Sequence, residues 1–312
     1  MRAVAATAYG PPEVLETIRL PRPSPGLREV LVRVSFIGVN PKDVVVRKGK
    51  FRRVTGHRFP MVLGNDIAGE VVEAGALADL SVGNSVFGMI NDFSGGAYAE
   101  YVAIQCAQVA TVPNGLDLKH AAAVPLAAQT ALQALRDRGE LRPGERVLIN
   151  GASGGVGTFA VQIAQRLGAH VTAVCSERNL ALCTDLGADN VIDYKATKLV
   201  DLRDRFDVFF DVFGNYRFDK VRHLLTSRGR YVHTIPSAQI FRDTLRTLRG
   251  PQRARLVYVR SRRADLEWLS AGLRDGGIRV VLDRVYPLSE AAAAHRYIET
   301  KRARGKVVLE VA

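Results

Sequence analysis

Residues 146–168 read RVLINGASGGVGTFAVQIAQRLG, so an apolar run, a glycine-rich turn and a helical pattern follow one another. This order predicts a β-strand, a tight turn and the N-terminus of an α-helix. Backbone N–H groups at such a turn point at a bound anion, and the helix dipole favours negative charge there. The predicted seat of a dinucleotide pyrophosphate comprises Gly151, Ala152, Ser153, Gly154, Gly155 and Val156. Gly157 then lets the helix pack closely on the strand.

An ordinary βα turn can carry the same glycines, so the neighbouring segments decide between the two interpretations. Further strand-like runs follow, with a helical stretch at 178–186 after the first of them. Strands and helices that alternate at this spacing predict an α/β fold with a doubly wound parallel sheet. The predicted strands after residue 150 are 170–175, 190–193, 206–213, 229–234 and 255–259.

The rest of the chain has a different sequence pattern. The first part alternates as β-strands do at 30–36 and 69–75, with glycine and proline turns between, which predicts a compact barrel-like domain. An alanine-rich helix is expected over 117–138, with Asp117 as its N-cap and Gly139 as its stop. The last predicted elements are a helix at 264–274, a strand near 285, a helix at 289–301 and a strand at 306–311.

The bulk properties are those of a globular enzyme. The chain has 312 residues, enough for two domains, and 47% of them are hydrophobic. No apolar run is long enough to cross a bilayer, and the N-terminal sequence has no signal-peptide core, so we expect a cytoplasmic protein without a membrane span. Cys106, Cys175 and Cys183 form no CxxC pair, which indicates free thiols.

The net charge of +13 raises the question of a polyanionic partner such as RNA. The densest basic run lies within 242–263, and no aromatic residues alternate with it as they do where bases stack. We therefore favour a solvated basic face over a nucleic-acid site. The arginines of this run are Arg242, Arg246, Arg249, Arg253, Arg255, Arg260, Arg262 and Arg263.

The second predicted strand of the sheet bears on which nicotinamide cofactor binds. An NAD site usually has a carboxylate at the end of this strand, which holds the adenosine 2′-OH. Here Ser176 stands at that place, with Arg178 close behind, and both can bond a 2′-phosphate. NADPH is therefore the expected cofactor, although a one-residue change of register would make Glu177 the acidic residue.

With these motifs in their order, the chain resembles the medium-chain dehydrogenase/reductase superfamily, in its zinc-free quinone oxidoreductase branch. The resemblance covers nearly the whole chain. It is carried by GVNPKD at 38–43, PMVLGNDIAG at 60–69, GGAYAEY at 95–101, QTA at 129–131, the glycine turn, LGADNVIDY at 186–194 and GKVVL at 305–309.

The resemblance implies a Rossmann nucleotide-binding domain inserted into a GroES-like β-barrel domain. Residues 1–116 and 266–312 would form the GroES-like catalytic domain, and 117–265 the Rossmann domain. The family often pairs subunits through the edge strand of the nucleotide domain, here 255–259, so a homodimer is expected unless the flanking arginines oppose it.

Family members that use zinc have ligands that this chain lacks. A cysteine stands in them where Asn40 stands here, a histidine where Asn65 stands, and the third ligand position, near Leu126, is apolar. Asp66 alone cannot hold a catalytic zinc, so we expect a structural role for it and no metal in the enzyme.

The resemblance also implies roles for single residues. Asn40 and Lys42 would lie by the substrate and are the candidate catalytic residues, orienting or polarising the acceptor oxygen. Besides the glycine turn, Ser176 and Arg178, the candidate cofactor residues are Thr130, Tyr194, Phe213, Gly214, Thr234, Ile235, Val259, Ser261 and Lys306.

We therefore expect an NADPH-dependent oxidoreductase that transfers hydride to a quinone or another α,β-unsaturated carbonyl compound. One alternative is a reductase of 2-enoyl thioesters or alkenals. Enoyl-thioester reductases of this fold use a tyrosine where Phe51 stands, and Phe51 has no proton to give. The other alternative is a low-turnover NADPH-binding protein with an RNA or other polyanionic partner.

Overall fold

The computed structural model describes residues 1–311, which form two compact units. Of the described residues, unit 1 comprises 1–129, 260–276 and 280–311, and unit 2 comprises 130–259 and 277–279. Unit 1 is thus built from both ends of the chain, and unit 2 is inserted between them, as expected.

Unit 2 is organised around a six-stranded sheet in which every neighbouring pair of strands is parallel. The order 11-10-9-12-13-14 reverses between β9 and β12, which makes the sheet doubly wound and confirms the predicted fold class. Its strands, in sheet order, are β11 (Asn190–Asp193), β10 (His170–Cys175), β9 (Arg146–Asn150), β12 (Phe206–Asp211), β13 (Leu225–His233) and β14 (Arg253–Leu256).

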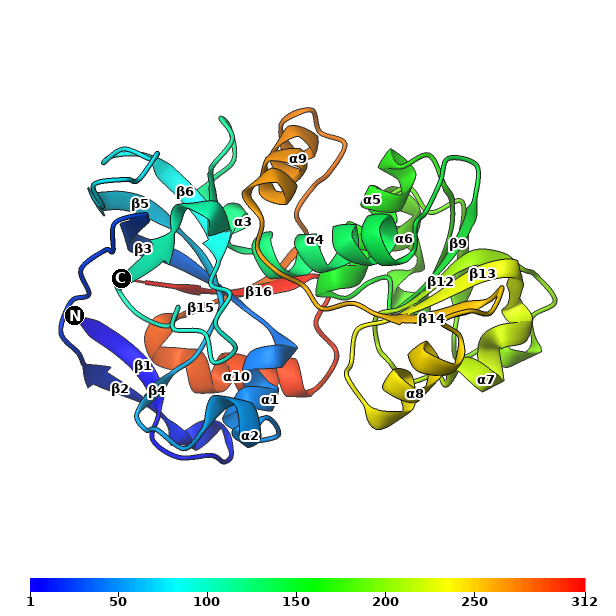
Figure 1. Cartoon of the computed structure of the whole chain (residues 1–312), viewed down its shortest axis with the longest axis horizontal. Helices are drawn as coiled ribbons and strands as arrows, with labels where there is room; N and C mark the ends of the chain where they lie inside the picture. Colours follow the sequence, from blue (N-terminus) through cyan, green and yellow to red (C-terminus); the bar gives the residue numbers. More distant parts are fainter. Residues whose placement is uncertain (312) are drawn as a thin grey trace. The chain divides into compact units, whose positions relative to one another are not determined.

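Helices cover both faces of this sheet. In Figure 1, α5 (Gly155–Arg166) and α6 (Leu180–Asp185) lie above it, while α7 (Phe218–Val221) and α8 (Ala238–Arg246) lie below it. Because both faces are covered, the central strands are apolar almost throughout: β12 reads FDVFFD and only Asp207 in it is not fully buried. The shorter helical turns of the unit are η3 (Gln133–Arg138), η4 (Glu177–Asn179), η5 (Leu199–Asp201) and η6 (Arg222–Leu224).

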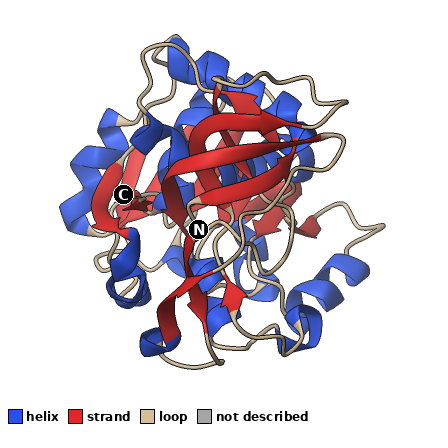
Figure 2. Cartoon of the chain, turned by 90° about the vertical axis from the view of Figure 1, so that its left-hand side faces the viewer, coloured by secondary structure: helices blue, strands red, loops and turns tan. Residues whose placement is uncertain are grey.

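Unit 1 is rich in β-structure. Its main sheet has the order 15-16-3-5-6-8, with β7 paired to β3, and a small sheet has the order 2-1-4. Figure 2 shows these strands as a curved layer facing the viewer. The strands are β1 (Arg2–Ala6), β2 (Leu15–Arg19), β3 (Glu29–Val39), β4 (Met61–Val62), β5 (Asp66–Ala74), β6 (Ser85–Met89), β7 (Tyr101–Gln105), β8 (Val109–Thr111), β15 (Leu282–Pro287) and β16 (Lys306–Glu310).

The core of unit 1 includes residues of these strands and of α10 (Ala291–Glu299). Val30, Val32 and Val34 enter it from alternate positions of β3, and Ile67 and Val71 enter it from β5. The remaining helices are α1 (Pro41–Arg47), α2 (Arg52–Thr55), α3 (Leu118–Ala122), α4 (Pro125–Leu132), α9 (Arg263–Arg274) and α10 (Ala291–Glu299). Short turns are η1 (Pro12–Val14), η2 (Cys106–Gln108) and η7 (Leu288–Glu290).

Two segments differ from the sequence prediction. The helix expected over 117–138 is divided into α3, α4 and η3, because Pro125 cannot continue α3 and starts a new helix. Asp117 does cap its first turn, accepting a hydrogen bond from the His120 N–H at 2.7 Å. Helix α8 had no counterpart in the prediction.

The boundary between the units also lies elsewhere than the predicted domain boundary. The segments 117–129 and 260–265 fall in unit 1, whereas the sequence placed them in the Rossmann domain. One reason is that α3 packs on strands β3, β5 and β6 of unit 1. A second is that Ser261 hydrogen-bonds to Asn91, Gln108 and Gln129 within unit 1. Among residues 1–311, no helix is long and apolar enough to span a membrane.

Candidate cofactor and active site

The glycine-rich turn of unit 2 lies between β9 and α5, as predicted. Both the Gly151 and the Ala152 N–H donate to the carbonyl oxygen of Val174 on β10, at 3.1 and 3.0 Å, which anchors the turn on the neighbouring strand. Gly151 has a φ of +85°, a conformation that favours glycine. At Gly157 a Cβ atom would lie 2.1 Å from the Gly151 carbonyl oxygen, so only glycine allows α5 to approach the turn.

The first turn of α5 is open to an anion. Gly154 is the N-cap, and no side chain accepts a hydrogen bond from the amides of the first turn, at Gly155 and Val156. A Cβ atom at Gly154 would meet nothing nearer than the Gly151 carbonyl oxygen at 3.5 Å. The uncapped N–H groups and the dipole of this twelve-residue helix fit the diphosphate of a dinucleotide.

Next to the turn, a polar group closes the end of β10. Ser176 is the first residue after this strand, and the buried Asn179 donates hydrogen bonds to the Ser176 Oγ at 3.3 Å and to the Ser153 Oγ at 2.9 Å. Arg178 is exposed in the same turn, as is Glu177. Asn179 thus joins the glycine turn to the place predicted for the adenosine phosphate, and sequence reasoning missed it.

Most other predicted cofactor residues of unit 2 come together because parallel strands end at one edge of the sheet. Thr234 follows β13 and donates from Oγ1 to the Val212 carbonyl oxygen after β12, at 2.8 Å. Tyr194, Phe213 and Ile235 are exposed at this edge. The residues placed there are Tyr194 after β11, Phe213 and Gly214 after β12, and Thr234 and Ile235 after β13, whereas Thr130 is buried on α4.

A buried carboxylate that sequence reasoning missed holds this edge together. Asp211, the last residue of β12, accepts hydrogen bonds from the Asn150 side chain at 2.7 Å and from the Tyr231 hydroxyl at 2.9 Å. It also accepts from the Gly214 N–H at 2.9 Å and the Tyr216 N–H at 3.0 Å. Asp211 thus holds the loop at 212–216 at two backbone N–H groups, together with the bond from Thr234 to Val212, and so helps to position the predicted Phe213 and Gly214.

The predicted pair Val259 and Ser261 falls on both sides of the unit boundary. Val259 ends the main segment of unit 2, and Ser261 belongs to unit 1. The buried Ser261 hydroxyl donates to the Gln108 carbonyl oxygen at 2.9 Å and accepts from the Gln129 amide at 3.2 Å. Its side chain is therefore used to hold the chain in unit 1.

In unit 1, three strand ends bring Asn40, Asp66 and Lys306 into one buried cluster. Gly38 pairs with Asp66 across β3 and β5, and Val307 pairs with Val39 across β16 and β3. The Lys306 ammonium donates to the Asn40 Oδ1 at 2.6 Å, to the Val39 carbonyl oxygen at 3.2 Å and to the Asp66 Oδ2 at 3.4 Å.

This cluster fixes the Asn40 amide on both sides. Its Nδ2 donates to the Asp66 Oδ2 at 2.9 Å while its Oδ1 accepts from Lys306. Burial raises the pKa of Asp66, opposed by the Lys306 charge and by hydrogen bonds from Asn40 and from the Leu126 N–H. All three N–H bonds of Lys306 are directed at partners within unit 1, so its role here is to hold Asn40.

Lys42, the second candidate catalytic residue, has ammonium N–H groups that make no hydrogen bond to the described residues. Among residues 1–311 its ammonium makes one hydrogen bond, to the Asp92 carbonyl oxygen at 3.4 Å, and it lies 4.9 Å from the centre of the Phe93 ring. Phe93 in turn meets Phe51 edge to face, with ring centres 4.8 Å apart. Burial lowers the pKa of Lys42, opposed by the charges of Asp43, Asp66 and Asp92. A half-buried ammonium beside an apolar ring can donate a proton to a carbonyl oxygen.

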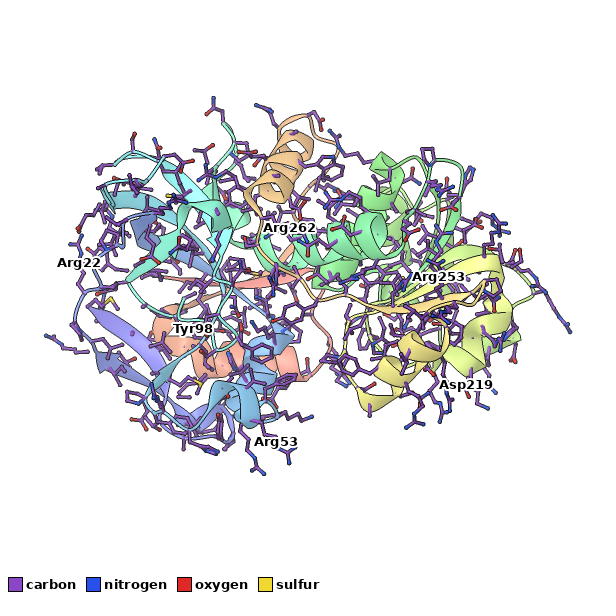
Figure 3. The ribbon with its side chains drawn as sticks, in the orientation of Figure 1. Arg22, Arg53, Tyr98, Asp219, Arg253 and Arg262 are labelled. Atoms are coloured by element: carbon purple, nitrogen blue, oxygen red, sulfur yellow. The ribbon has the colours of Figure 1, made fainter. Side chains whose placement is uncertain are left out.

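Behind Asn40 lies a second buried group that the sequence did not reveal. The Asp43 carboxylate accepts from the Asn40 N–H at 2.9 Å and from the Tyr98 hydroxyl at 3.2 Å, and the Tyr98 oxygen lies 2.9 Å from the His295 Nε2. Burial raises the pKa of Asp43 to about 6, and burial lowers the pKa of His295 to about 3. His295 is therefore neutral, and its Nε2–H can donate to Tyr98, which lies near α10 in Figure 3.

The residues at the zinc-ligand positions do not fit a zinc ion. Asn65 donates to the carbonyl oxygens of Ile90 and Asp92, at 2.7 and 2.9 Å, and Asn40 is held as described. Asp66 already accepts from Asn40, Lys306 and the Leu126 N–H. Zinc sites need thiolate, imidazole or free carboxylate ligands. Within residues 1–311, no group of three or more histidines, cysteines or acidic residues is arranged to hold a metal.

Comparison with known proteins decides the family. The chain is 30% identical to a chloroplast envelope quinone oxidoreductase homolog of Arabidopsis thaliana, over 99% of this chain and 98% of that protein. The chain belongs to the medium-chain dehydrogenase/reductase superfamily. It stands in the quinone oxidoreductase branch of that superfamily.

Other relatives of this superfamily agree. An NADPH-dependent alkenal/one oxidoreductase of Arabidopsis thaliana is 34% identical, over 90% of this chain and 72% of that protein. The structure of the quinone oxidoreductase from Coxiella burnetii has a TM-score of 0.92 and 30% identity, and the match covers 100% of this chain and 99% of that one.

Two family patterns match parts of the chain. The alcohol dehydrogenase GroES-like domain matches residues 26–114, which confirms the expected type of unit 1. The zinc-binding dehydrogenase pattern matches residues 186–309. Its description names a metal that the side chains at Asn40, Asn65 and Leu126 do not fit, for the reasons given above.

Proposed function

We propose that this medium-chain dehydrogenase/reductase uses NADPH to reduce a quinone or another α,β-unsaturated carbonyl compound without zinc. The observation that carries the proposal is the uncapped glycine turn next to a strand end that lacks a carboxylate. Ser153, Asn179 and Ser176 form a neutral polar group there. The names of two Arabidopsis relatives, one a quinone oxidoreductase homolog and one an NADPH-dependent alkenal/one oxidoreductase, support the substrate class.

The choice of NADPH rests on the charge of the β10 end. Ser176 and the exposed Arg178 offer a hydroxyl and a guanidinium group, both of which bond phosphate oxygens. A carboxylate at the same place would repel the 2′-phosphate. Glu177 lies one residue further along, outside the strand, in turn η4.

The bound cofactor supplies a hydride from C4 of its nicotinamide ring. Lys42 donates a proton to the acceptor oxygen as this oxygen gains negative charge, so a quinone leaves as a hydroquinone and an enone as an enol. The Lys42 amine regains its proton from water. Asn40 positions the segment that carries Lys42, because Lys306, Asp66 and Asp43 hold its amide and its backbone N–H.

The apolar rings near Lys42 favour a flat, apolar acceptor. Phe51 lies against Phe93, and Phe93 lies below the Lys42 ammonium. The phenol that enoyl-thioester reductases of this fold use is missing at Phe51, which makes the 2-enoyl thioester alternative the weaker one.

Steady-state oxidation of NADPH and NADH tests the proposal. The acceptors are a set of benzoquinones and naphthoquinones, a set of alkenals, and crotonyl thioesters. We expect turnover with the quinones and alkenals, and a kcat/KM for NADPH at least about ten-fold above that for NADH. A clear preference for the thioester, or for NADH, would overturn the proposal in substrate or in cofactor.

A further inference from the structure

Helix α8 leaves an apolar stripe in water. It packs on β14, where Ile240 shares a core cluster with Ala254, and its buried residues are Ile240 and Asp243. Phe241, Leu245 and Leu248 are 59%, 74% and 53% exposed. Residues at i, i+4 and i+7 lie on one side of a helix and its following turn, so the three side chains form one stripe.

Arginines adjoin this stripe. Arg242, Arg246 and Arg249 each follow a stripe residue by one position and are exposed, and their side chains make no ion pair or hydrogen bond among residues 1–311. The one acidic residue of the segment, Asp243, is buried and accepts from the Gln239 amide at 2.9 Å. We call the exposed side chains of Phe241, Arg242, Leu245, Arg246, Leu248 and Arg249 the α8 face.

The basic surface extends beyond the α8 face. A hollow of about 310 Å³ lies between α7 and α8, with Arg222 and Arg246 in its lining. A second hollow, of about 320 Å³, shares Gly250 and Pro251 with the first. Its charged lining residues are four arginines and two glutamates: Arg142, Arg228, Arg230, Arg253, Glu140 and Glu145. Figure 3 labels Arg253 on β14 and Asp219 on α7, which both line these hollows.

The guanidinium groups of the second hollow are mostly unpaired. Arg230 is bound to Glu145, with one nitrogen–oxygen distance of 3.0 Å and the other 2.5 Å. The side chains of Arg142, Arg228 and Arg253 have no ion pair in the described chain. Elsewhere in the basic run, Arg263 is paired with Asp79. Arg28 and Arg203 are also exposed without an ion pair in the described chain, so the apolar stripe beside the arginines is what distinguishes the α8 face.

We propose that the α8 face and these hollows form a docking surface for an anionic lipid bilayer. A short basic helix with exposed phenylalanine and leucine is the type of surface that inserts at the headgroup level. Unpaired arginines gain from the negative potential of an anionic leaflet, and the net charge of +13 adds to the attraction. A nucleic acid would use the arginines but leave the apolar stripe in water, so the stripe favours lipid. This inference goes beyond the proposed function and does not depend on it.

Vesicle co-sedimentation of the whole protein tests the surface. The probes are pure phosphatidylcholine vesicles and vesicles with about one-third phosphatidylglycerol. We expect binding to the anionic vesicles, at least about ten-fold weaker binding to the zwitterionic ones, and loss of binding at about 1 M salt.

Two variants distinguish the contribution of the apolar stripe to vesicle binding from that of the arginine charges. Leu245→Ser with Leu248→Ser removes apolar area and keeps the charge, whereas Arg242→Gln, Arg246→Gln and Arg249→Gln removes three charges. Each should weaken partitioning to anionic vesicles by about ten-fold or more. The matched control, Arg19→Gln with Arg28→Gln and Arg203→Gln, loses the same charge from exposed sites outside the α8 face and should bind nearly as the wild type does. Thermal unfolding midpoints verify that all variants fold.

Three results would overturn the proposal. If the wild type binds both kinds of vesicle equally, or binds neither, an anionic bilayer is not the partner of this surface. Equal losses in the α8 and control arginine variants would assign the binding to net charge alone. Binding of an RNA oligonucleotide that is tighter than vesicle binding and unaffected by Leu245→Ser with Leu248→Ser would assign the arginines to a nucleic acid.

Discussion

Lys42 is the residue on which the proposed chemistry rests. Its ammonium is half-buried, adjoins Phe93 and makes a single hydrogen bond within the part of the chain that the structure describes, so two N–H groups can face an acceptor. Replacing Lys42 with methionine should lower kcat for quinone reduction by about 100-fold, because a positioned acid contributes about that factor or more. Steady-state kinetics measures it. The control is Lys50→Met at an exposed position nearby.

The pH profile distinguishes an acid from a merely structural lysine. Burial lowers the pKa of Lys42 below its ordinary 10.5, and the ammonium is the active form. The kcat should therefore fall as pH rises through a pKa below 10.5, and Lys42→Arg should lose this alkaline limb. An unchanged kcat in Lys42→Met, or an unchanged limb in Lys42→Arg, would contradict the role of Lys42 as the proton donor.

Asp43 makes stability depend on pH. Its pKa rises from 3.8 to about 6 on folding, so the folded protein holds more protons than the unfolded chain in that range and loses stability as pH rises through it. Asp43→Asn keeps an acceptor for Asn40 and Tyr98 without the charge. From about pH 4 to about pH 7, its unfolding free energy should gain up to about 3 kcal/mol relative to the wild type. Urea unfolding at several pH values measures this difference, and a difference that does not grow with pH would refute the burial of an ionised Asp43.

Ser176 is the residue that should decide between the two cofactors. Ser176→Asp places a carboxylate at the end of β10, where the 2′-phosphate of NADPH is expected. The Kd of NADPH should rise at least about ten-fold relative to that of NADH, because like charges repel strongly in a partly buried site. Ser176→Ala is the matched control, with a smaller loss for NADPH. Calorimetric titration that finds equal changes for both cofactors in Ser176→Asp would place the adenosine elsewhere.

At the scale of elements, the start of α5 offers a test that separates folding from cofactor binding. A Cβ atom at Gly154 would meet no atom closer than 3.5 Å, whereas one at Gly157 would lie 2.1 Å from a backbone oxygen. Gly154→Ala should therefore keep the unfolding midpoint and weaken NADPH binding by about ten-fold, because its methyl group occupies the approach to the diphosphate. Gly157→Ala should lower the midpoint itself. Unchanged NADPH binding in Gly154→Ala would show that the diphosphate does not bind at this turn.

The sequence predicted the parallel sheet because its strands are buried on both faces and read as short apolar runs between helices. Helix α8 was missed because the run 242–263 was interpreted by its charge. Its apolar residues Ile240, Phe241 and Leu245 do recur at helical spacing, opposite its arginines, so the pattern of an amphipathic helix was present. The helix expected over 117–138 was drawn too long because its alanine content outweighed the break that Pro125 imposes.

The sequence predicted the parts of the candidate site that depend on backbone conformation. It did not predict the parts that depend on hydrogen bonds between residues far apart in the chain. The glycine turn was found because only glycine allows the close approach of α5 to β9. Asp211, Asn179 and the Asp43 group were missed because a polar residue at a strand end or in a turn has no pattern of its own. For Lys306, the sequence placed the residue near the site, and its partners Asn40 and Asp66 became known only from the pairing of β16, β3 and β5.

At the scale of the whole molecule, one question is how copies of the chain associate. β14 is the edge strand of the six-stranded sheet, so a homodimer paired through it stays a prediction. Arg253 and Arg255 stand on this strand, and burial together with the Arg253 charge lowers the pKa of Arg255. Two such edges would bring four arginines together, which opposes close pairing unless an anion lies between them. Such a dimer would also cover Arg253 of the second hollow, so it and the proposed lipid surface exclude one another at this edge.

The absence of zinc ligands is the property of the molecule that most separates it from the metal-dependent members of its superfamily. Where those have ligands, this chain has amides and an apolar side chain, and the Lys306 ammonium lies against the remaining carboxylate of Asp66. The positive charge near Asn40 is thus supplied by the protein itself.

The most direct measurement is NADPH-driven quinone reduction by protein from which metals have been removed with a strong chelator. The account predicts that kcat and KM stay unchanged after chelation, and that added zinc does not increase the rate. Loss of activity on chelation and its recovery with zinc, or no NADPH oxidation with any quinone or alkenal before chelation, would contradict it.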